Sequence, residues 1–386
     1  MTEPKTQPGL SSYAGNTFNA GGLGKHSSDE LRRILAGKTV GAGFGITGDA
    51  FILSGATNRE DLLLELQLIA AHITDPGYRD ESARQATKRM EQMYLQLAHT
   101  PSGPINLEVL RLLASGDSRF GTPAQEVMNQ RTLAEVRAWL SPQLATGPIE
   151  IGVVGDFELE ATIAAVGKTL GALPARAPRS DHAELRNVSF PAEAFTKNYT
   201  VETEIPKGLV TLFWPSTDAL EVKRTRRLSM LASVLSDRLR VKVREEIGGA
   251  YSPSAGSSPS ENYPGYGFFA AQVTVEPAKA KEISDVVIAL AADLASNGVT
   301  AEELERAKQP VLTATRESLR NNNYWLSSVL SRAQEKPEVL DWSRSRLADI
   351  EGMKAEDLSA LAKLYFPAAR AFRVTVLPIA KTAAAK

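Results

Sequence analysis

The sequence of 386 residues contains no cysteine and only four histidines. The absence of cysteine excludes disulfide bonds, thiolate metal ligands and a cysteine nucleophile. No two histidines are spaced as H-x3-H or H-x-x-E-H, so no helix face presents two imidazoles to one metal ion. We therefore expect no zinc site within this chain. The four histidines are His26, His72, His99 and His182.

Neither sign of charge is in excess, since 44 Lys and Arg face 45 Asp and Glu for a net charge of -1. This balance gives no electrostatic basis for binding nucleic acid or an anionic membrane. No apolar run approaches the roughly 20 residues that span a bilayer, so we expect no transmembrane segment. The polar start, "MTEPKTQPGLSSYAGN", is not a signal peptide. We therefore expect either a cytoplasmic protein or an internal piece of an exported one.

Common nucleotide and hydrolase motifs are also missing. "AGGLGKHSS" is not a P-loop, because Asn19 stands at the first glycine and His26 at the Ser/Thr that binds magnesium. "GAGFG" at 41–45 lacks the third glycine of a dinucleotide fingerprint. No G-x-S-x-G occurs, which leaves a nucleophile elbow without support. "DSRFGTP" at 117–123 is expected as a turn followed by a helix start.

Two parts of the chain share a pattern of helix, glycine and helix, followed by another helix and a β-rich run. Gly77 and Glu135 are 58 positions apart, and so are Gly298 and Glu356. Equal spacing at two anchors indicates a duplicated domain. The paired helices, recognised by apolar residues at helical spacing, are expected at 60–75, 79–99, 280–296 and 300–320.

A segment rich in proline and charge separates the two repeats at 173–198. We therefore predict a first domain at 1–175, a linker at 176–198 and a second domain at 199–380. In each domain strands come first, then helices, then a returning strand. This order favours an α+β fold of two homologous domains, each an antiparallel-rich mixed sheet with helices packed on one face.

The stretch "RLRVKVREEIGGAYSPSAGSSPSENYPGYGFFAAQVTV" at 238–275 begins as a helix, breaks at two glycines and continues as strands. Arg244 lies in the last helical turn, where the helix dipole favours a cation. Tyr251 opens the first strand. From spacing alone, these two residues are a helix-capping arginine and a half-buried strand tyrosine.

"VREEIGGAYSPSAG" also resembles the signature in the C-terminal half of pitrilysin/insulinase-type zinc metallopeptidases, the inverted H-x-x-E-H group. "DPGYRDESARQATKRM" and "NGVTAEELERAKQPVLTATRESLRNNNYWL" are similar to that family too, and the resemblance covers nearly the whole chain. Such enzymes have two homologous halves that close like a clamshell, and only the N-terminal half carries zinc. The resemblance implies that Arg244 and Tyr251 contact substrate or transition state in the complete enzyme.

The family's zinc motif is absent at the matching place. "GLSSYAGN" puts Ser12, Gly15 and Asn16 where the motif has His, Glu and His, and we expect Glu91 near the remaining glutamate ligand. The resemblance thus implies no metal or cofactor in this chain and zinc in a complementary half. The family's opening β-hairpin is also missing, so we expect an N-terminally cut second half or a separately encoded non-catalytic subunit.

Two functional hypotheses follow from the resemblance. In the first, the chain is the zinc-free half of a metalloendopeptidase: it encloses peptide substrate, supplies Arg244 and Tyr251, and is inactive alone. Its partners are the zinc-bearing half and peptide, in the periplasm or alternatively the cytoplasm. In the second, it is a non-enzymatic assembly or peptide-binding subunit, like respiratory-complex core proteins. The retained Arg/Tyr pair argues against the second, and an H-x-x-E-H motif encoded upstream would support the first.

Overall fold

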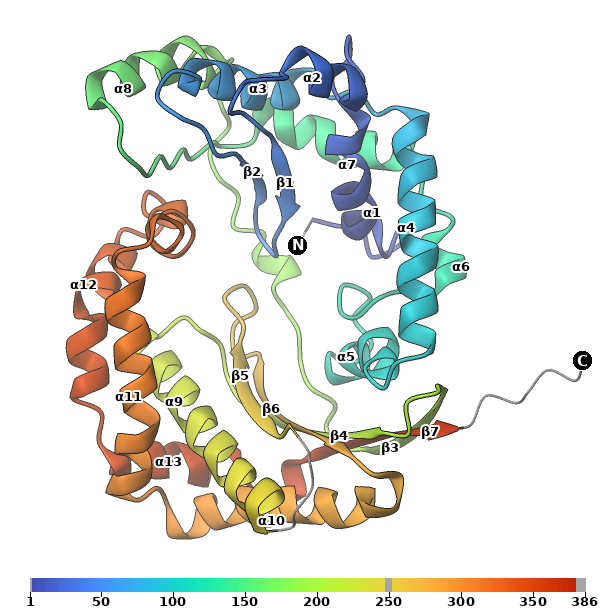
Figure 1. The fold of residues 1–386 in the computed structure, drawn as a ribbon, viewed down its shortest axis with the longest axis vertical. Helices are drawn as coiled ribbons and strands as arrows, with labels where there is room; N and C mark the ends of the chain where they lie inside the picture. Colours follow the sequence, from blue (N-terminus) through green and yellow to red (C-terminus); the bar gives the residue numbers. More distant parts are fainter. Residues whose placement is uncertain (1, 247–251, 380–386) are drawn as a thin grey trace, which may run out of the picture. The chain divides into compact units, whose positions relative to one another are not determined.

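The computed structural model describes the backbone of residues 2–246 and 252–379, with side chains described up to Val243 and from Ser252 (Figure 1). The chain forms two compact units. The first comprises Met1–Tyr94 and Thr122–Leu185, and the second comprises Leu95–Gly121 and Arg186–Lys386. The break after Leu185 falls inside the predicted linker at 176–198, whereas residues 95–121, which the prediction placed in the first domain, belong to the second unit.

The first unit consists mainly of helices around a two-stranded antiparallel sheet. In the sheet, β1 (Gly43–Ile46) pairs with β2 (Phe51–Ser54). The predicted β-rich run of this domain, "PIEIGVVG", does not join this ladder; its residues are half-buried or exposed. The α-helices of this unit are α1 (Leu10–Thr17), α2 (Ser28–Ile34), α3 (Leu62–Thr74), α4 (Asp80–Ala98), α6 (Gln125–Met128), α7 (Leu133–Thr146) and α8 (Leu159–Lys168).

The second unit is built on a five-stranded mixed sheet with strand order β3-β7-β4-β6-β5. Only β3 and β7 run parallel, which confirms the predicted antiparallel-rich α+β sheet. The strands are β3 (Thr196–Glu202), β4 (Gly208–Pro215), β5 (Ser254–Pro259), β6 (Gly267–Val275) and β7 (Phe372–Ile379). The α-helices are α5 (Leu110–Leu113), α9 (Val222–Leu239), α10 (Ala280–Asn297), α11 (Ala301–Ser318), α12 (Glu338–Glu351) and α13 (Ala355–Tyr365).

The main core of the second unit lies between one face of this sheet and its long helices. Trp214 and Phe269 from the sheet are fully buried there against Leu231 of α9 and Ile283 of α10. The alternation of β4 sends every second side chain to this face and the others to the opposite face. Burial of these large side chains is the main favourable contribution to the stability of the unit.

A second, smaller core explains why residues 95–121 belong to the second unit. Val109 and Leu113 of this segment are fully buried against Phe213, Phe372 and other side chains on the opposite face of the sheet. The helices pack on one face as predicted, and this segment covers part of the other. Periodicity within 95–121 carries no information about which sheet it covers, so the sequence did not reveal this packing.

The duplication appears in the order of the elements. Helices α4 and α11 begin 221 positions apart, the same offset that separates Gly77 from Gly298. A π-helical segment follows each of these helices, at Ile105–Val109 (η2) and Tyr324–Val329 (η7). Gly77 has to be glycine because a Cβ there would lie 2.3 Å from the carbonyl oxygen of Gly21. The two helix pairs thus repeat at a constant offset, as the predicted duplication requires.

No single helix in the described part of the chain is long and apolar enough to cross a membrane. Helices α10 and α11, with the turn before α10, reach that length and composition only as a pair bent by 111°.

Candidate functional site

The signature segment joins α9 to β5. Helix α9 continues as a π-helical segment at Arg240–Glu246 (η5), and β5 begins at Ser254. The backbone of Arg244 lies in this π-helical segment, while its side chain and the whole of Tyr251 lie outside the described residues. Their predicted contacts with substrate or transition state therefore stay a prediction.

The helix that leads to this segment is firmly placed by its apolar face. The predicted stripe is fully buried, because residues spaced three and four apart share one side of a helix. The stripe continues into η5, so the first turn of the π-helical segment is also held against the core. Its members are Leu228, Leu231, Leu235, Leu239 and Val243.

An ion-pair cluster fixes the C-terminal end of α9. The Arg238 guanidinium donates to both carboxylate oxygens of Glu303, at 2.6 and 3.0 Å, and to the Gly298 carbonyl at 2.9 Å. It also pairs with Asp293 at 2.5 Å. Burial raises the pKa of Glu303, but the hydrogen bonds from Arg238 and Thr300 outweigh it and hold this pKa below its usual range. The end of α9 that carries the signature is thus tied to the turn between α10 and α11.

The β5–β6 turn is held by a buried carboxylate. One oxygen of Asp218 accepts hydrogen bonds from the Leu220 amide at 3.1 Å and from the Arg224 guanidinium at 2.9 Å. The other oxygen accepts from the Gly265 amide at 2.6 Å. Asp218 therefore links the loop before α9 to the turn that follows β5.

An aromatic cluster packs around the same turn. Tyr266 stacks on Phe190 with ring centroids 4.6 Å apart, and Phe120 lies within 5.3 Å of both Tyr263 and Tyr266. Burial is the main cause that raises the pKa of Tyr266. Phe120 belongs to "DSRFGTP", the stretch expected as a turn before a helix, and α6 indeed begins just after it. The prediction missed its role as packing for the β5–β6 turn.

The three residues at the positions of the family's zinc motif lie on one side of α1, in the first unit. Ser12 and Gly15 are exposed, and Asn16 is half-buried. Arg89 of α4 donates to the Asn16 carbonyl at 2.6 Å. Glu91, predicted to lie near this face, is exposed on α4. The Arg89 guanidinium, the Ser12 hydroxyl and the Asn16 amide do not fit a zinc site, because zinc is bound by imidazole, thiolate or carboxylate ligands.

No group of three or more His, Asp or Glu side chains within the described residues is arranged to hold a metal ion.

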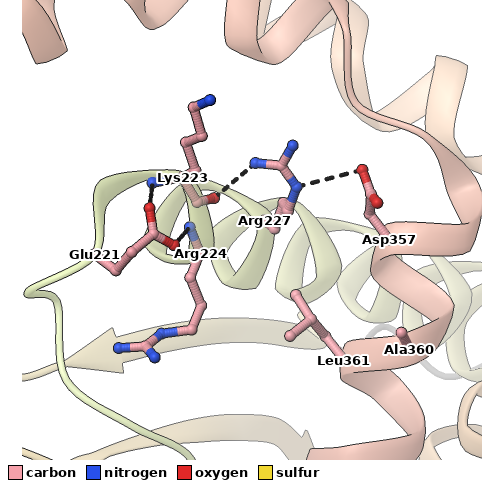
Figure 2. A pocket seen from close by; sticks show the side chains of 7 residues that line it. All are labelled: Glu221, Lys223, Arg224, Arg227, Asp357, Ala360 and Leu361. Atoms are coloured by element: carbon pink, nitrogen blue, oxygen red, sulfur yellow. Dashed lines mark hydrogen bonds and ion pairs between the residues drawn. The ribbon is translucent and has the colours of Figure 1, made fainter.

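A surface depression of about 240 Å³ lies at the opposite end of α9 (Figure 2). Its charges are largely matched: the Glu221 carboxylate caps the amides of Lys223 and Arg224, and Arg227 lies 3.3 Å from Asp357. Eighteen helical residues, or about 27 Å, separate this end of α9 from the signature end. The depression therefore lies one helix length from the signature end of α9 and is not assigned to that segment. Its lining is completed by Ala360 and Leu361.

Residues 132–311 match the family described as the peptidase M16 inactive domain. The match begins at the N-cap of α7 and ends within α11, so it includes the signature segment. The predicted resemblance to pitrilysin/insulinase-type metallopeptidases is thereby confirmed. Residues 132–311 are thus similar to an M16 inactive domain, and the chain has the fold of one half of such a clamshell peptidase.

Comparisons with individual proteins agree with this family. The chloroplastic stromal processing peptidase of Pisum sativum is 25% identical over 292 residues, which are 62% of this chain and 23% of that protein. Its counterpart in Oryza sativa subsp. indica is 22% identical over 291 residues, with the same coverage. The matched region thus spans about a quarter of the length of these curated relatives.

Solved structures show the same fold. The periplasmic protease PqqL of Escherichia coli has a TM-score of 0.78 at 19% identity, covering 98% of this chain and 41% of that one. A protease from Helicobacter pylori has a TM-score of 0.81 at 14% identity, covering 98% and 91%. A peptidase M16 inactive domain from Pseudomonas fluorescens has a TM-score of 0.77 at 17% identity, covering 97% and 90%.

Proposed function

We propose that this chain is the zinc-free half of a metalloendopeptidase, which encloses a peptide substrate and contributes Arg244 and Tyr251 to the active site of a zinc-bearing half. The observation that carries the proposal is the family match at 132–311, which contains the signature segment and describes an inactive domain. The chain is expected to be inactive alone, since Ser12, Gly15 and Asn16 do not fit a metal site.

The architecture around the signature segment supports this role. Helix α9 is fixed along its length by a buried stripe and at its end by Arg238. The following strand is fixed by the turn that Asp218 holds. A donor that stabilises a transition state acts best when its scaffold is already in place, because no reorganisation is then needed during the reaction.

The chemistry assigned to the pair is hydrogen-bond donation. A zinc ion held by the other half would supply the Lewis acidity that makes water a nucleophile at neutral pH. The Tyr251 hydroxyl donates to the carbonyl oxygen of the scissile peptide as negative charge develops there. The Arg244 guanidinium donates to the same oxygen or to nearby substrate backbone. Activity then depends on closure of the two halves, which also excludes bulk water.

The proposed substrate class is a peptide or a small unfolded protein. A structural neighbour with a TM-score of 0.75 at 14% identity is the ferredoxin protease FusC in complex with Arabidopsis ferredoxin, and its covered part is 40% of that chain. The structural neighbour PqqL is a periplasmic protease. These relatives support a protease context and suggest the periplasm as the location, with the cytoplasm as the alternative.

The proposal is tested by reconstitution. The wild-type chain is mixed with the zinc-bearing half, and cleavage of an internally quenched peptide is measured. The same assay is repeated with the Tyr251→Phe chain and with the Arg244→Met chain. Removal of one transition-state donor is expected to lower kcat by about 10²–10³. Tyr324→Phe and Arg344→Met serve as matched controls on η7 and α12 and are expected to keep kcat within about twofold.

Full activity of Tyr251→Phe would refute the assigned role of that hydroxyl. Peptide cleavage by this chain alone, abolished by a chelator, would refute its inactivity. Absence of cleavage in the reconstituted mixture, combined with stable complex formation, would instead support a non-enzymatic subunit.

A further inference from the structure

The two edges of the five-stranded sheet differ in how they are protected. The β3 edge carries Lys197 and Glu202, both exposed. It is also contacted from outside, since a ring nitrogen of His99 lies 2.6 Å from the Glu202 carbonyl oxygen. Charged side chains and covering groups are the usual means by which proteins prevent further strands from adding to a sheet.

The β5 edge has no such protection. Its sequence, SAGSSP, contains no charged side chain. Its backbone pairs with β6 from Ser254↔Gln272 to Pro259↔Gly267, and residues 254–259 make no backbone hydrogen bond on the outer side in the part of the chain that the structure describes. Unpaired amides and carbonyls along a strand edge are a template for one more strand.

Small side chains leave this edge accessible on one face. Helix α9 lies against β5 (Figure 1), and Ala255 packs on the core that α9 helps to form. Positions Gly256 and Ser258 lie on the face of the sheet opposite to Ala255 and are exposed. An added Cβ at Gly256 would meet no atom within 4 Å. Phe268 of β6, paired with Ser258, is half-buried and provides an apolar surface beside these small residues.

The open stretch is short, because Pro253 and Pro259 bracket it. Five residues of strand span about 17 Å, enough for two or three backbone hydrogen-bond pairs with one extended segment. An edge of this length is too small for a stable dimer of this chain, which needs on the order of 1,000 Å² of buried surface. The edge therefore suits a single extended peptide more than a second copy.

We propose that β5 binds an extended peptide segment by strand addition, through backbone hydrogen bonds and an apolar contact with Phe268. This inference rests on the proposed function and specifies where the zinc-free half would hold its substrate. Because the edge offers backbone groups and no charge, it recognises extended conformation and tolerates many sequences. A segment with alternating apolar side chains and no proline fits it best.

The test uses the whole 386-residue chain and hydrogen exchange read by mass spectrometry. The probe is a capped nine-residue peptide of alternating threonine and valine, and its matched control has proline at every second position. With the first peptide, backbone amides within residues 254–258 are expected to exchange at least tenfold more slowly. The proline peptide, which lacks the required amides, is expected to give no protection.

Two matched double variants separate the edges. Gly256→Lys with Ser258→Lys places charges beside the β5 edge at exposed positions and should weaken probe binding at least tenfold. Asn198→Lys with Thr200→Lys does the same on exposed positions of β3 and should change binding less than twofold.

Three results would overturn the proposal: no protection of 254–258, equal loss of binding in both variants, or protection that grows with protein concentration when no peptide is present. The last result would assign the edge to a second copy of the chain. Because no zinc-bearing half is used, failure here leaves the reconstitution assay of Tyr251→Phe unaffected, and the two proposals can fail separately.

Discussion

The ion pair between Arg238 and Glu303 gives the sharpest prediction about stability. Each side chain is only 13% exposed. The guanidinium also forms an ion pair with Asp293 and donates a hydrogen bond to the Gly298 carbonyl. Removing one partner of a fully buried pair costs about 3–5 kcal/mol because the other charge is left without compensation. The partial exposure of this cluster reduces that cost, so we expect Arg238→Ala to lower the free energy of unfolding of the second unit by about 2–3 kcal/mol.

A double-mutant cycle isolates the pair from the rest of the cluster. Glu303 also closes the capping box of α11 with Thr300, and a glutamine at this position can keep that capping interaction. Glu303→Gln therefore removes the charge while retaining the cap. The coupling energy between Arg238→Ala and Glu303→Gln is expected to be about 1–2 kcal/mol. Urea unfolding followed by the fluorescence of the buried Trp214 measures it.

The same pair predicts a pH dependence. The pKa of Glu303 is lowered in the folded protein. The ionised carboxylate therefore contributes fully to the free energy of unfolding above its unfolded pKa of about 4.3, and this contribution is lost as the pH falls through the folded pKa. The coupling energy should thus be constant from pH 7 to pH 5 and decline below about pH 4.3. A coupling energy below about 0.5 kcal/mol at pH 7 would refute the reasoning.

Two further predictions concern the first unit. Gly77→Ala should destabilise it by about 1–3 kcal/mol in thermal unfolding, because the added Cβ meets the Gly21 carbonyl oxygen at 2.3 Å. Gly15→Ala, where nothing lies within 4 Å, should instead be neutral or stabilising by up to about 1 kcal/mol; equal effects would contradict the packing argument. Burial raises the pKa of Glu65 despite the hydrogen bond from the Gly41 amide, so ionisation of Glu65 opposes folding at neutral pH. Glu65→Gln should therefore be more stable than the wild type at pH 7, with a difference that shrinks as the pH falls toward about 4.3; an unchanged difference in urea titrations at both pH values would contradict this.

Local patterns in the sequence predicted a large part of the fold. All five stripe residues of α9 are buried, from Leu228 to Val243, because a helix face depends only on spacing along the chain. The duplicated helix pairs around Gly77 and Gly298 also occur where predicted, since their apolar period and glycine turns are local signals. The family resemblance rested on the same kind of short-range information.

Contacts between distant residues were not predictable in this way. Arg89, rather than Glu91, reaches the face of α1 that carries Asn16, and this depends on the rotation of one helix against another. Asp218 and Gly265 meet only after β4 and β6 have paired. The expected β-rich run "PIEIGVVG" has a suitable apolar composition, but strand formation also requires a partner edge, which composition does not reveal.

The amino-acid sequence by itself determined the lack of a metal-binding motif, the duplication and the position of the Arg244/Tyr251 signature, because each is a matter of residue type and spacing. Only the tertiary structure decided that residues 95–121 cover the second face of the sheet and that β5 is an edge strand without charged protection. The physical reason is that burial and strand pairing are properties of surfaces assembled from segments far apart in the chain.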